Sequence, residues 1–275
     1  MPEGHTIHRL AADHRERFCG RVVRASSPQG KFSDGAALVD GLPMTAAEAH
    51  GKHLFLGFGS AGWVHVHLGL IGKFGFGGGT APPPAGTVRL RLATPSHYAD
   101  LRGPAACALI TEPDKQAIHA RLGPDPLRPG DDPDRVYARM ARSRISVAAL
   151  LLDQKVIAGV GNVYRAEVLF RHGVDPFLAG RDLPRPVWDA MWADLVALMR
   201  EGVRTNRIDT VRPEHEPAAM GRPPRVDDHG GEVYVYRRTG LPCLVCGTPV
   251  RTRPLDARNL FWCPTCQPGT AQDTP

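Results

Sequence analysis

Cys243-Leu-Val-Cys246, followed after sixteen residues by Cys263-Pro-Thr-Cys266, is the most constrained part of this 275-residue chain. Two Cys-x-x-Cys pairs at such a separation are typical of a zinc ion held tetrahedrally by four thiolates. Each pair places two sulfurs on one tight turn, and the residues between the pairs can run out and back as a β-hairpin. We therefore predict that Cys243, Cys246, Cys263 and Cys266 bind one structural zinc ion.

The alternative for these cysteines is a pair of disulfide bonds in a secreted domain. No signal peptide precedes Met1-Pro2-Glu3-Gly4-His5, so we do not expect an oxidising compartment. The two remaining cysteines, Cys19 and Cys107, have apolar or small neighbours and are expected to be core residues. The sequence therefore favours zinc.

The zinc stretch also carries most of the excess positive charge of the chain. Between Val233 and Pro268, five arginines against one acid, Asp256, give a net charge of +4, out of +6 for the whole sequence. A solvated surface usually mixes both signs, whereas arginines without acidic neighbours favour contacts with phosphate groups. The arginines are Arg237, Arg238, Arg251, Arg253 and Arg258.

Length and periodicity set the outline of the remaining chain. There is room for two domains and a small metal module, and no apolar run approaches the length that crosses a membrane. Residues 4–18 carry one helical stripe that Gly20 ends, and residues 123–133, rich in proline and glycine, are expected to be a linker. Short strands are predicted at 21–26, 52–58, 62–68 and 87–92, helices at 133–141, 146–154, 162–171 and 186–202, and a loop over 209–231.

Two stretches indicate where a polar or charged ligand could lie. In Trp63-Val-His-Val-His-Leu68 the valines face one way, and His65 and His67 face the other as the wall of a polar cleft, although core histidines are commoner. Gly159-Val-Gly161 leads into the helix that begins at Asn162, and such a turn presents backbone N–H groups to a phosphate. A Gly-x-Gly turn alone is weak evidence, and this one is no dinucleotide fingerprint because no βαβ unit surrounds it.

The amino terminus offers a nucleophile. The small side chain of Pro2 allows the initiator methionine to be trimmed, which frees a secondary amine beside Glu3. Such an amine is partly unprotonated near neutral pH and can attack a carbon at the aldehyde oxidation level to form an iminium, while the carboxyl shuttles protons. Met-Pro-Glu is a common start, so the other motifs decide whether this chemistry applies.

Five motifs follow one another along the chain. They are Pro2-Glu3-Gly4, Gly51-Lys52-His53-Leu54, His67-Leu68-Gly69-Leu70, Asp153-Gln154-Lys155 with Gly159-Val-Gly-Asn-Val-Tyr-Arg-Ala-Glu-Val-Leu-Phe170, and the four-cysteine ribbon that ends at Cys266-Gln267. In this order they resemble the formamidopyrimidine-DNA glycosylase and endonuclease VIII family of base-excision repair enzymes. The resemblance spans residues 2–267, nearly the whole chain.

The resemblance implies an α+β multidomain fold. An N-terminal β-sandwich with a leading catalytic helix is expected over residues 1–122, a helix–two-turns–helix domain over 123–232, a zinc ribbon over 233–268 and a tail over 269–275. Damaged DNA is the partner that the resemblance implies, bound between the domains by a monomer that uses no organic cofactor. The expected setting is a bacterial cytoplasm, in association with the nucleoid and not with a membrane.

The resemblance also implies roles for single residues. Pro2 matches the nucleophile of the family, Glu3 its acid–base partner and Lys52 a lysine that contacts phosphate at the lesion. Asn162 and Arg258 match the two residues that grip the phosphates around the lesion. The remaining DNA contacts expected are Leu70 and Ile71, where the family fills the gap left by a flipped base, together with His67 and Arg102.

Two departures from the family pattern bear on the damaged base. The family usually has a glutamate where this chain has Thr6, and members that read oxidised purines tend to have Asp-x-Arg-x-Phe-Gly in place of Asp100-Leu-Arg-Gly-Pro-Ala105. Both favour oxidised pyrimidines over 8-oxoguanine. The expected reaction is base removal through a Pro2 Schiff base, followed by β,δ-elimination. The alternatives are an oxidised-purine glycosylase and a non-catalytic, zinc-dependent DNA-binding protein.

Overall fold

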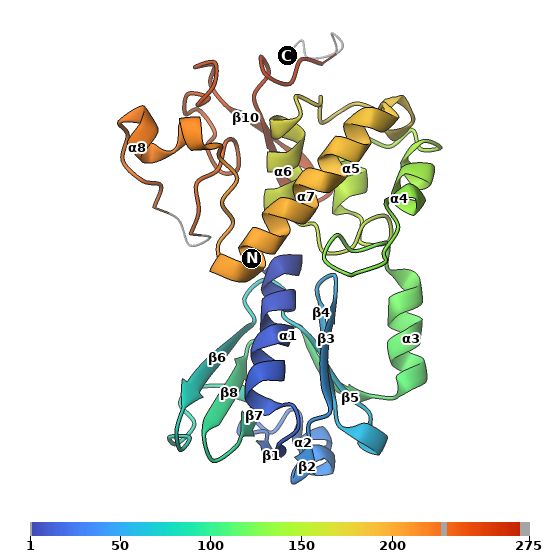
Figure 1. Cartoon of the computed structure of the whole chain (residues 1–275), viewed down its shortest axis with the longest axis vertical. Coiled ribbons are helices and arrows are strands. Elements are labelled where there is room, and N and C mark those ends of the chain that lie inside the picture. Colours follow the sequence, from blue (N-terminus) through green and yellow to red (C-terminus); the bar gives the residue numbers. More distant parts are fainter. Residues whose placement is uncertain (1, 227–229, 270–275) are drawn as a thin grey trace. The chain divides into compact units, whose positions relative to one another are not determined.

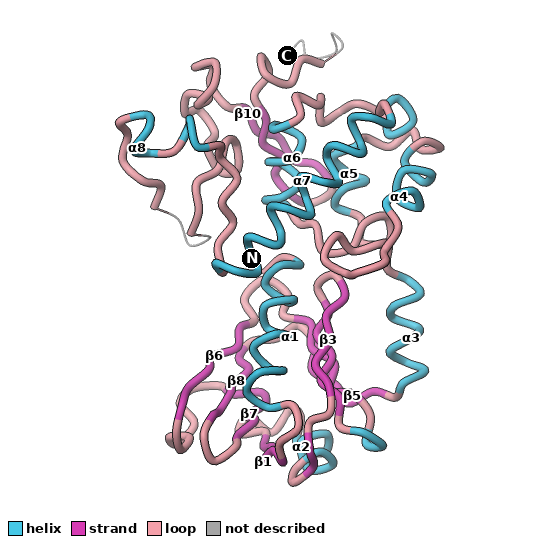
Figure 2. The backbone as a smooth tube through the Cα atoms, viewed as in Figure 1, coloured by secondary structure: helices cyan, strands magenta, loops and turns pink. Residues whose placement is uncertain are grey.

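The structure is a computed structural model that describes residues 2–226 and 230–269, and it divides into two compact units, residues 1–121 and 122–275. Strands concentrate in the first unit and helices in the second (Figure 1, Figure 2). The predicted mixed α+β fold is therefore confirmed. Parts of the expected loop and tail, at residues 227–229 and 270–275, lie outside the described residues.

Two antiparallel sheets form the first unit. Their strands are β1 (Val22–Ser26), β2 (Leu42–Pro43), β3 (Ala46–His50), β4 (His53–Gly57), β5 (Trp63–His67), β6 (Lys73–Gly78), β7 (Val88–Ala93), β8 (His97–Arg102) and β9 (Ala106–Ile110). One sheet has the order β2-β1-β7-β8-β6 and the other the order β3-β4-β5-β9. Buried side chains from both sheets, such as Leu54, Val64 and Leu90, form one apolar core. The four predicted strands correspond to β1, β4, β5 and β7 within one residue at each end.

Helix α1 (Gly4–Phe18) covers the predicted residues and packs on β3 and β4 (Figure 1). Its apolar stripe is buried, and Arg15 Nη1 on its flank donates to Ala47 O at 2.9 Å. Gly20, with a φ of 78°, supplies the left-handed residue that turns the chain into β1. These contacts fix the helix whose first residue follows Glu3.

Three shorter helices complete the first unit: α2 (Ser33–Val39), the 3₁₀ turn η1 (Gly59–Ala61) and α3 (Glu112–Arg121). Lys115 of α3 is buried against β5, with its ammonium 3.4 Å from the centre of the Trp63 ring and 2.7 Å from the Glu48 carboxylate. A buried lysine requires such a partner. The contacts of Lys115 with Trp63 and Glu48 fasten α3 to the sheet.

The second unit is built around α6 (Asn162–Arg171), which is buried from Asn162 to Phe170. The expected linker has an irregular backbone, but residues 123–126 are buried. Gly123 N donates to Gln154 O at 2.9 Å and so attaches this segment to the helical residues. Within the described residues, no helix is long and apolar enough to span a membrane. The other helices are α4 (Pro133–Met140), α5 (Val147–Leu152), η2 (Gly180–Asp182), α7 (Arg185–Thr205), η3 (Pro213–His215) and α8 (Pro217–Met220).

A β-hairpin lies between the two cysteine pairs, as predicted. It consists of β10 (Arg251–Leu255) and β11 (Arg258–Trp262), and β11 packs on α6. Asp256 and Ala257, with φ of 50° and 57°, form its two-residue turn, which matches the twist of paired strands. Arg258 is thus the first residue after the turn.

Candidate functional site

The four cysteines predicted to bind zinc converge in the second unit. Their sulfur atoms all lie within 4.8 Å of one another, with 3.8 Å between Cys243 and Cys266 and 3.4 Å between Cys246 and Cys263. Four sulfurs at about 2.3 Å from a tetrahedral zinc ion lie about 3.8 Å apart, whereas a disulfide joins its sulfurs at about 2.05 Å. The geometry therefore fits one structural zinc ion and excludes the disulfide alternative.

The two residues expected to grip phosphate lie on neighbouring segments. Asn162, which follows the Gly159-Val-Gly161 turn, donates from Nδ2 to Asn259 O at 3.0 Å, and Asn259 directly follows Arg258. This contact joins the first residue of α6 to the start of β11. The positive end of the α6 dipole is at the same place and favours an anion there.

Arg165 holds this junction together, although the sequence pattern did not single it out. Its side chain is fully buried, and Nη2 donates to Asn162 Oδ1 and, at 3.4 Å, to Asn259 O. A buried guanidinium requires such acceptors. The available signal was a charged residue in a helix whose neighbouring residues are mostly apolar.

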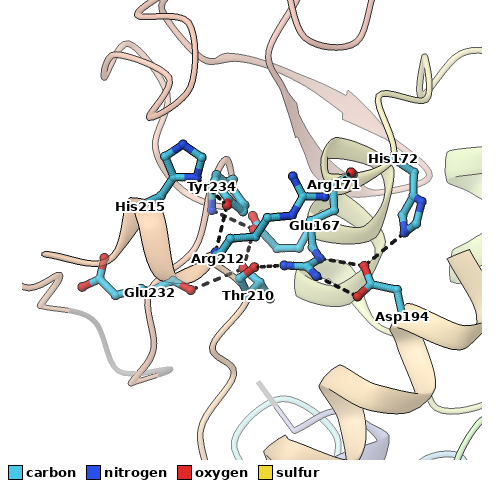
Figure 3. A network of polar contacts seen from close by, with 9 residues as sticks. All are labelled: Glu167, Arg171, His172, Asp194, Thr210, Arg212, His215, Glu232 and Tyr234. Carbon is cyan, nitrogen blue, oxygen red and sulfur yellow. Dashed lines mark hydrogen bonds and ion pairs between the residues drawn. The ribbon is translucent and has the colours of Figure 1, made fainter. Parts of the chain in front are cut away.

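Glu167, two residues further along α6, is a second buried residue that sequence reasoning missed. Its carboxylate accepts from Thr210 Oγ1 at 2.6 Å and from Tyr234 N at 2.7 Å (Figure 3). The N–H groups of Val235 and Tyr236 donate to its other oxygen, both at 2.9 Å. This carboxylate therefore ties the irregular segment 234–236, which leads to the first cysteine pair, to α6.

An ion-pair network extends from this point to α7 (Figure 3). Asp194 accepts from Arg171 at 2.6 and 2.8 Å and contacts His172 Nε2 at 3.1 Å. Burial disfavours the charged form of Asp194, but bonds from His172 and Arg171 outweigh it and lower the pKa to about 2. Arg171 also donates to Thr210 O, so the network holds the segment around Thr210 between two helices.

Pro2 and Glu3 stand at the start of α1 in the first unit. Pro2 is half-buried and Glu3 is fully buried, while Glu3 O accepts from Thr6 N at 3.0 Å as the helix cap. Thr6 Oγ1, at the position of the family glutamate, lies 3.2 Å from His5 Nε2. A carboxylate directly beside the expected nucleophile is therefore shielded from water.

Lys52 lies in the turn between β3 and β4, close to His67 of β5. Burial and the charge of Lys52 lower the pKa of His67, and His53, the next residue after Lys52, pairs in register with His67. His53 Nδ1 lies 2.8 Å from His65 Nε2, and both rings stack on Phe55. The histidine face, predicted to be the wall of a polar cleft, carries a stack formed by the rings of His53, Phe55 and His65.

Leu70 and Ile71 form the exposed tip of a tight turn. They are 62% and 81% exposed, which is unusual for large apolar residues and suits a wedge that fills a gap in DNA. Gly72 N and Ala105 N both donate to Leu68 O, at 3.1 and 3.3 Å, and hold the base of the turn. The tip therefore projects from a fixed base.

Arg102 lies on the sheet beside this turn. Its Nη2 donates to Asp100 Oδ2 at 2.9 Å, and Asp100 also pairs with Arg91 at 2.6 Å. The structure thus groups the candidate residues by unit. The first holds Pro2, Glu3, Lys52, His67, Leu70, Ile71 and Arg102, and the second holds Asn162, Arg258 and the zinc cysteines.

Three family profiles match the chain. The Formamidopyrimidine-DNA glycosylase N-terminal domain matches residues 1–107, and the Formamidopyrimidine-DNA glycosylase H2TH domain matches residues 122–212. The zinc finger found in FPG and IleRS matches residues 240–269. Together they cover strands β1 to β8 and the start of β9, the helices around α6, and the cysteine ribbon.

Relatives match over the whole length. Endonuclease 8 1 of Mycobacterium tuberculosis is 49% identical, over 97% of this chain and 100% of its own. Formamidopyrimidine-DNA glycosylase of Desulfitobacterium hafniense is 30% identical, over 97% and 98%. A solved structure of Lactococcus lactis Fpg in complex with DNA containing an abasic site superposes with a TM-score of 0.77 at 19% identity, over 97% and 100%. At that identity the structural likeness shows the fold.

Proposed function

Because the chain belongs to the formamidopyrimidine-DNA glycosylase and endonuclease VIII family, and is a DNA glycosylase of base excision repair with AP lyase activity, we propose that oxidised pyrimidines are its substrates. The 49% identity to Endonuclease 8 1 carries this proposal, since the relative named formamidopyrimidine-DNA glycosylase stands at 30%. Thr6 and the Gly103-Pro104-Ala105 turn support it, because the chain lacks the glutamate that is usual in the family and the aromatic residue typical of members that read oxidised purines.

The proposed chemistry starts at Pro2. Its secondary amine bonds to C1′ of the damaged nucleotide, the glycosidic bond breaks, and the base leaves with a proton. Loss of the amine proton and opening of the sugar ring give an iminium, which acidifies C2′–H. Loss of that proton expels the 3′ phosphate, a second elimination expels the 5′ phosphate, and water releases Pro2. Glu3, buried beside Pro2, is the proposed proton carrier.

DNA binding is proposed to use residues of both units. Asn162 and Arg258 hold phosphates at the lesion, which their junction at the start of α6 supports, and Lys52 holds another. An enzyme that acts on a stacked base must extrude it and fill the hole. Leu70 and Ile71 do this in the proposal, which their exposure supports.

The proposal also covers two further DNA contacts, the zinc ribbon, the oligomeric state and the location of the enzyme. His67 and Arg102 contact DNA, and residues 233–268 act as a separate ribbon beside the helical residues 123–232. The enzyme works as a monomer in a bacterial cytoplasm, beside the nucleoid, without an organic cofactor. Size-exclusion chromatography at working concentration tests the monomer, because a stable dimer elutes at twice the mass.

Borohydride trapping on DNA with an abasic site tests the reaction. An iminium enzyme becomes covalently fixed to the DNA, whereas a non-catalytic DNA-binding protein does not. Excision of thymine glycol and dihydrouracil, measured beside 8-oxoguanine on single- and double-stranded DNA, tests the substrate. Faster release of 8-oxoguanine would replace the pyrimidine proposal with the purine alternative.

A further inference from the structure

A tight hairpin turn carries Lys52, one of the residues proposed to hold a phosphate. Strands β3 and β4 pair in register as far as His50 and His53, so only two residues, Gly51 and Lys52, connect them. Gly51 has a φ of 57° and supplies the positive φ that such a turn requires at its first central position. The backbone of Lys52 is therefore placed by the strand residues on either side of the turn.

His53, the first residue of β4 after this turn, is bound to the next strand of the sheet. Its Nδ1 lies 2.8 Å from His65 Nε2 of β5, so one imidazole donates to this hydrogen bond and the other accepts. The two rings are 17° from parallel, with their centres 5.1 Å apart. The Phe55 ring lies within 20° of parallel to both. The orientation of the His53 side chain is thus fixed by His65 and Phe55.

His53 also contacts His67, the other residue of this sheet that is proposed to touch DNA. The two are direct partners across β4 and β5, and their ring centres lie 5.0 Å apart. His53 therefore lies between two proposed DNA contacts, because it follows Lys52 in the chain and faces His67 across the sheet. A change in its position would affect both of them.

The pair of His53 and His65 is uncharged near pH 7. Burial, followed by the charges of neighbouring histidines, lowers the pKa of His53 to about 3 and that of His65 to about 4. A neutral imidazole can donate at one nitrogen and accept at the other, as this hydrogen bond requires. The pair therefore adds no positive charge of its own for a phosphate. The other titratable or charged groups around it are His50, Lys52, His67, Lys115, His119 and Arg121.

We propose that the hydrogen-bonded pair of His53 and His65 is a positioning device of the enzyme, which holds Lys52 and His67 in place for their contacts with DNA. This inference rests on the proposed function, because Lys52 and His67 contact DNA only within it. A residue that touches phosphate releases counterions when DNA binds, whereas a neutral positioning residue does not. The salt dependence of binding therefore separates the two roles.

The test uses the full-length zinc-bound protein and three substitutions. His65→Phe removes the hydrogen bond but keeps a ring beside Phe55. His65→Gln restores a donor and an acceptor at about the reach of Nε2, because its amide ends the side chain. Lys52→Ala removes a proposed contact itself. His97→Phe, at the start of β8 in the other sheet, is the matched control. Affinity for duplex DNA with a stable abasic analogue is measured at several salt concentrations.

We expect His65→Phe to bind this DNA about fivefold more weakly than the wild type, which is the effect of about one hydrogen bond, with an unchanged slope of log affinity against log salt. His65→Gln should recover most of the affinity, and His97→Phe should equal the wild type. Lys52→Ala should make the slope shallower by about 1. In the double variant of His65→Phe and Lys52→Ala, the two losses should add to less than their sum, because the pair acts partly through Lys52.

Wild-type affinity in His65→Phe overturns the inference. So does a failure of His65→Gln to recover affinity, which would show that the ring only packs, and so does a shallower slope in His65→Phe, which would make His65 itself a contact. If His65→Phe lacks the urea transition of the first unit, His53→Phe removes the same bond from the other strand and is judged by the same affinity and slope.

Two further measurements separate this inference from the proposed function. An unchanged slope in Lys52→Ala rejects Lys52 as a phosphate contact, and the positioning role fails with it. Borohydride trapping on DNA with an abasic site is run on the same samples. Trapping of the wild type together with undiminished affinity in His65→Phe rejects the positioning role alone. Weaker binding of His65→Phe with the wild-type slope, but without trapping of the wild type, retains that role and rejects the proposed reaction.

Discussion

Glu167 carries four hydrogen bonds on one buried carboxylate, and three of its donors are the successive backbone N–H groups of Tyr234, Val235 and Tyr236. Glu167→Gln keeps the shape but turns an amide N–H₂ toward these donors. We expect the free energy of unfolding of the second unit to fall by about 2–3 kcal/mol, because bonds to a charged group contribute about 1.5–3 kcal/mol. Urea unfolding followed by tryptophan fluorescence measures this.

Glu201→Gln is the matched control. Glu201 lies on the exposed side of α7 and pairs with Arg204 at 2.5 Å, and water screens such a surface pair, so we expect little change in stability. Equal losses in the two variants would show that Glu167 acts as an ordinary surface charge, in contradiction to its four bonds.

Among single residues, the sequence predicts those that belong to recognisable motifs and misses buried residues whose role is to hold distant segments together. Asn162 and Arg258 follow from the family resemblance at the glycine turn and the ribbon, and the structure joins their segments through Asn259. Arg165 and Glu167 escape prediction because their acceptors and donors lie far along the chain. A charged residue in an apolar helix is a visible signal, but it does not say which backbone groups it will meet.

Two histidines on neighbouring strands make the sheet of β3, β4, β5 and β9 sensitive to acid. Burial, followed by the charge of neighbouring histidines, lowers the pKa of His53 to about 3 and that of His65 to about 4. Both values lie below the unfolded value of about 6.5, so the unfolded chain binds more protons between these limits. The stability is fully present above about pH 6.5 and is lost as the pH falls toward 4 and 3.

His65→Phe tests this at the element scale, because a phenyl ring preserves the stack on Phe55 and cannot be protonated. We expect its urea midpoint to fall less than that of the wild type between pH 7 and pH 5. His5 and His14, whose pKa values burial lowers to about 4, keep part of the dependence. Identical pH profiles would contradict the prediction. The other titratable or charged groups around the pair are His50, His67, Lys115, His119 and Arg121.

Strands with a clear alternating apolar pattern were predictable from the sequence, whereas strands that depend on pairing with a neighbouring strand were not. β5 alternates, so Val64 and Val66 could be assigned to the core from the sequence. β6 alternates Phe74 and Phe76 with glycines, which weaken a strand on their own, and it pairs along its whole length with β8. A Cβ at Gly77 would lie 2.3 Å from the Tyr98 ring, so a larger residue there would have to displace that ring. Such a non-local cause leaves no local signal.

For the whole molecule, two separate cores mean that a defect in one unit need not unfold the other. Removal of zinc with a chelator, or Cys246→Ser, should unfold the ribbon and abolish DNA binding, because a structural zinc ion contributes its binding free energy to folding. The sandwich should keep its own urea transition. Zinc content, far-UV circular dichroism and DNA binding are measured together, with Cys19→Ser as the zinc-retaining control. Simultaneous loss of both transitions would show that the units unfold as one.

The proposed function also places the nucleophile Pro2 in one unit and the phosphate grip of Asn162 and Arg258 in the other, and two variants of the whole chain separate these roles. A retained N-terminal tag converts the Pro2 amine into an amide, which cannot form an iminium. We expect the tagged protein to bind DNA with an abasic site at the wild-type salt slope and to give no trapped complex with borohydride. Trapping at full yield would show that Pro2 is not the nucleophile.

Arg258→Ala should behave in the opposite way. It keeps the amine, so trapping persists at reduced yield, while loss of one phosphate contact makes the slope of log affinity against log salt shallower by about 1. Zinc content should not change, because Arg258 lies at the turn of the hairpin and the cysteines lie at its far end. A wild-type slope with a full trapping yield would mean that Arg258 serves the hairpin rather than the DNA. The grip at the start of α6 would then consist of Asn162 and the helix dipole alone.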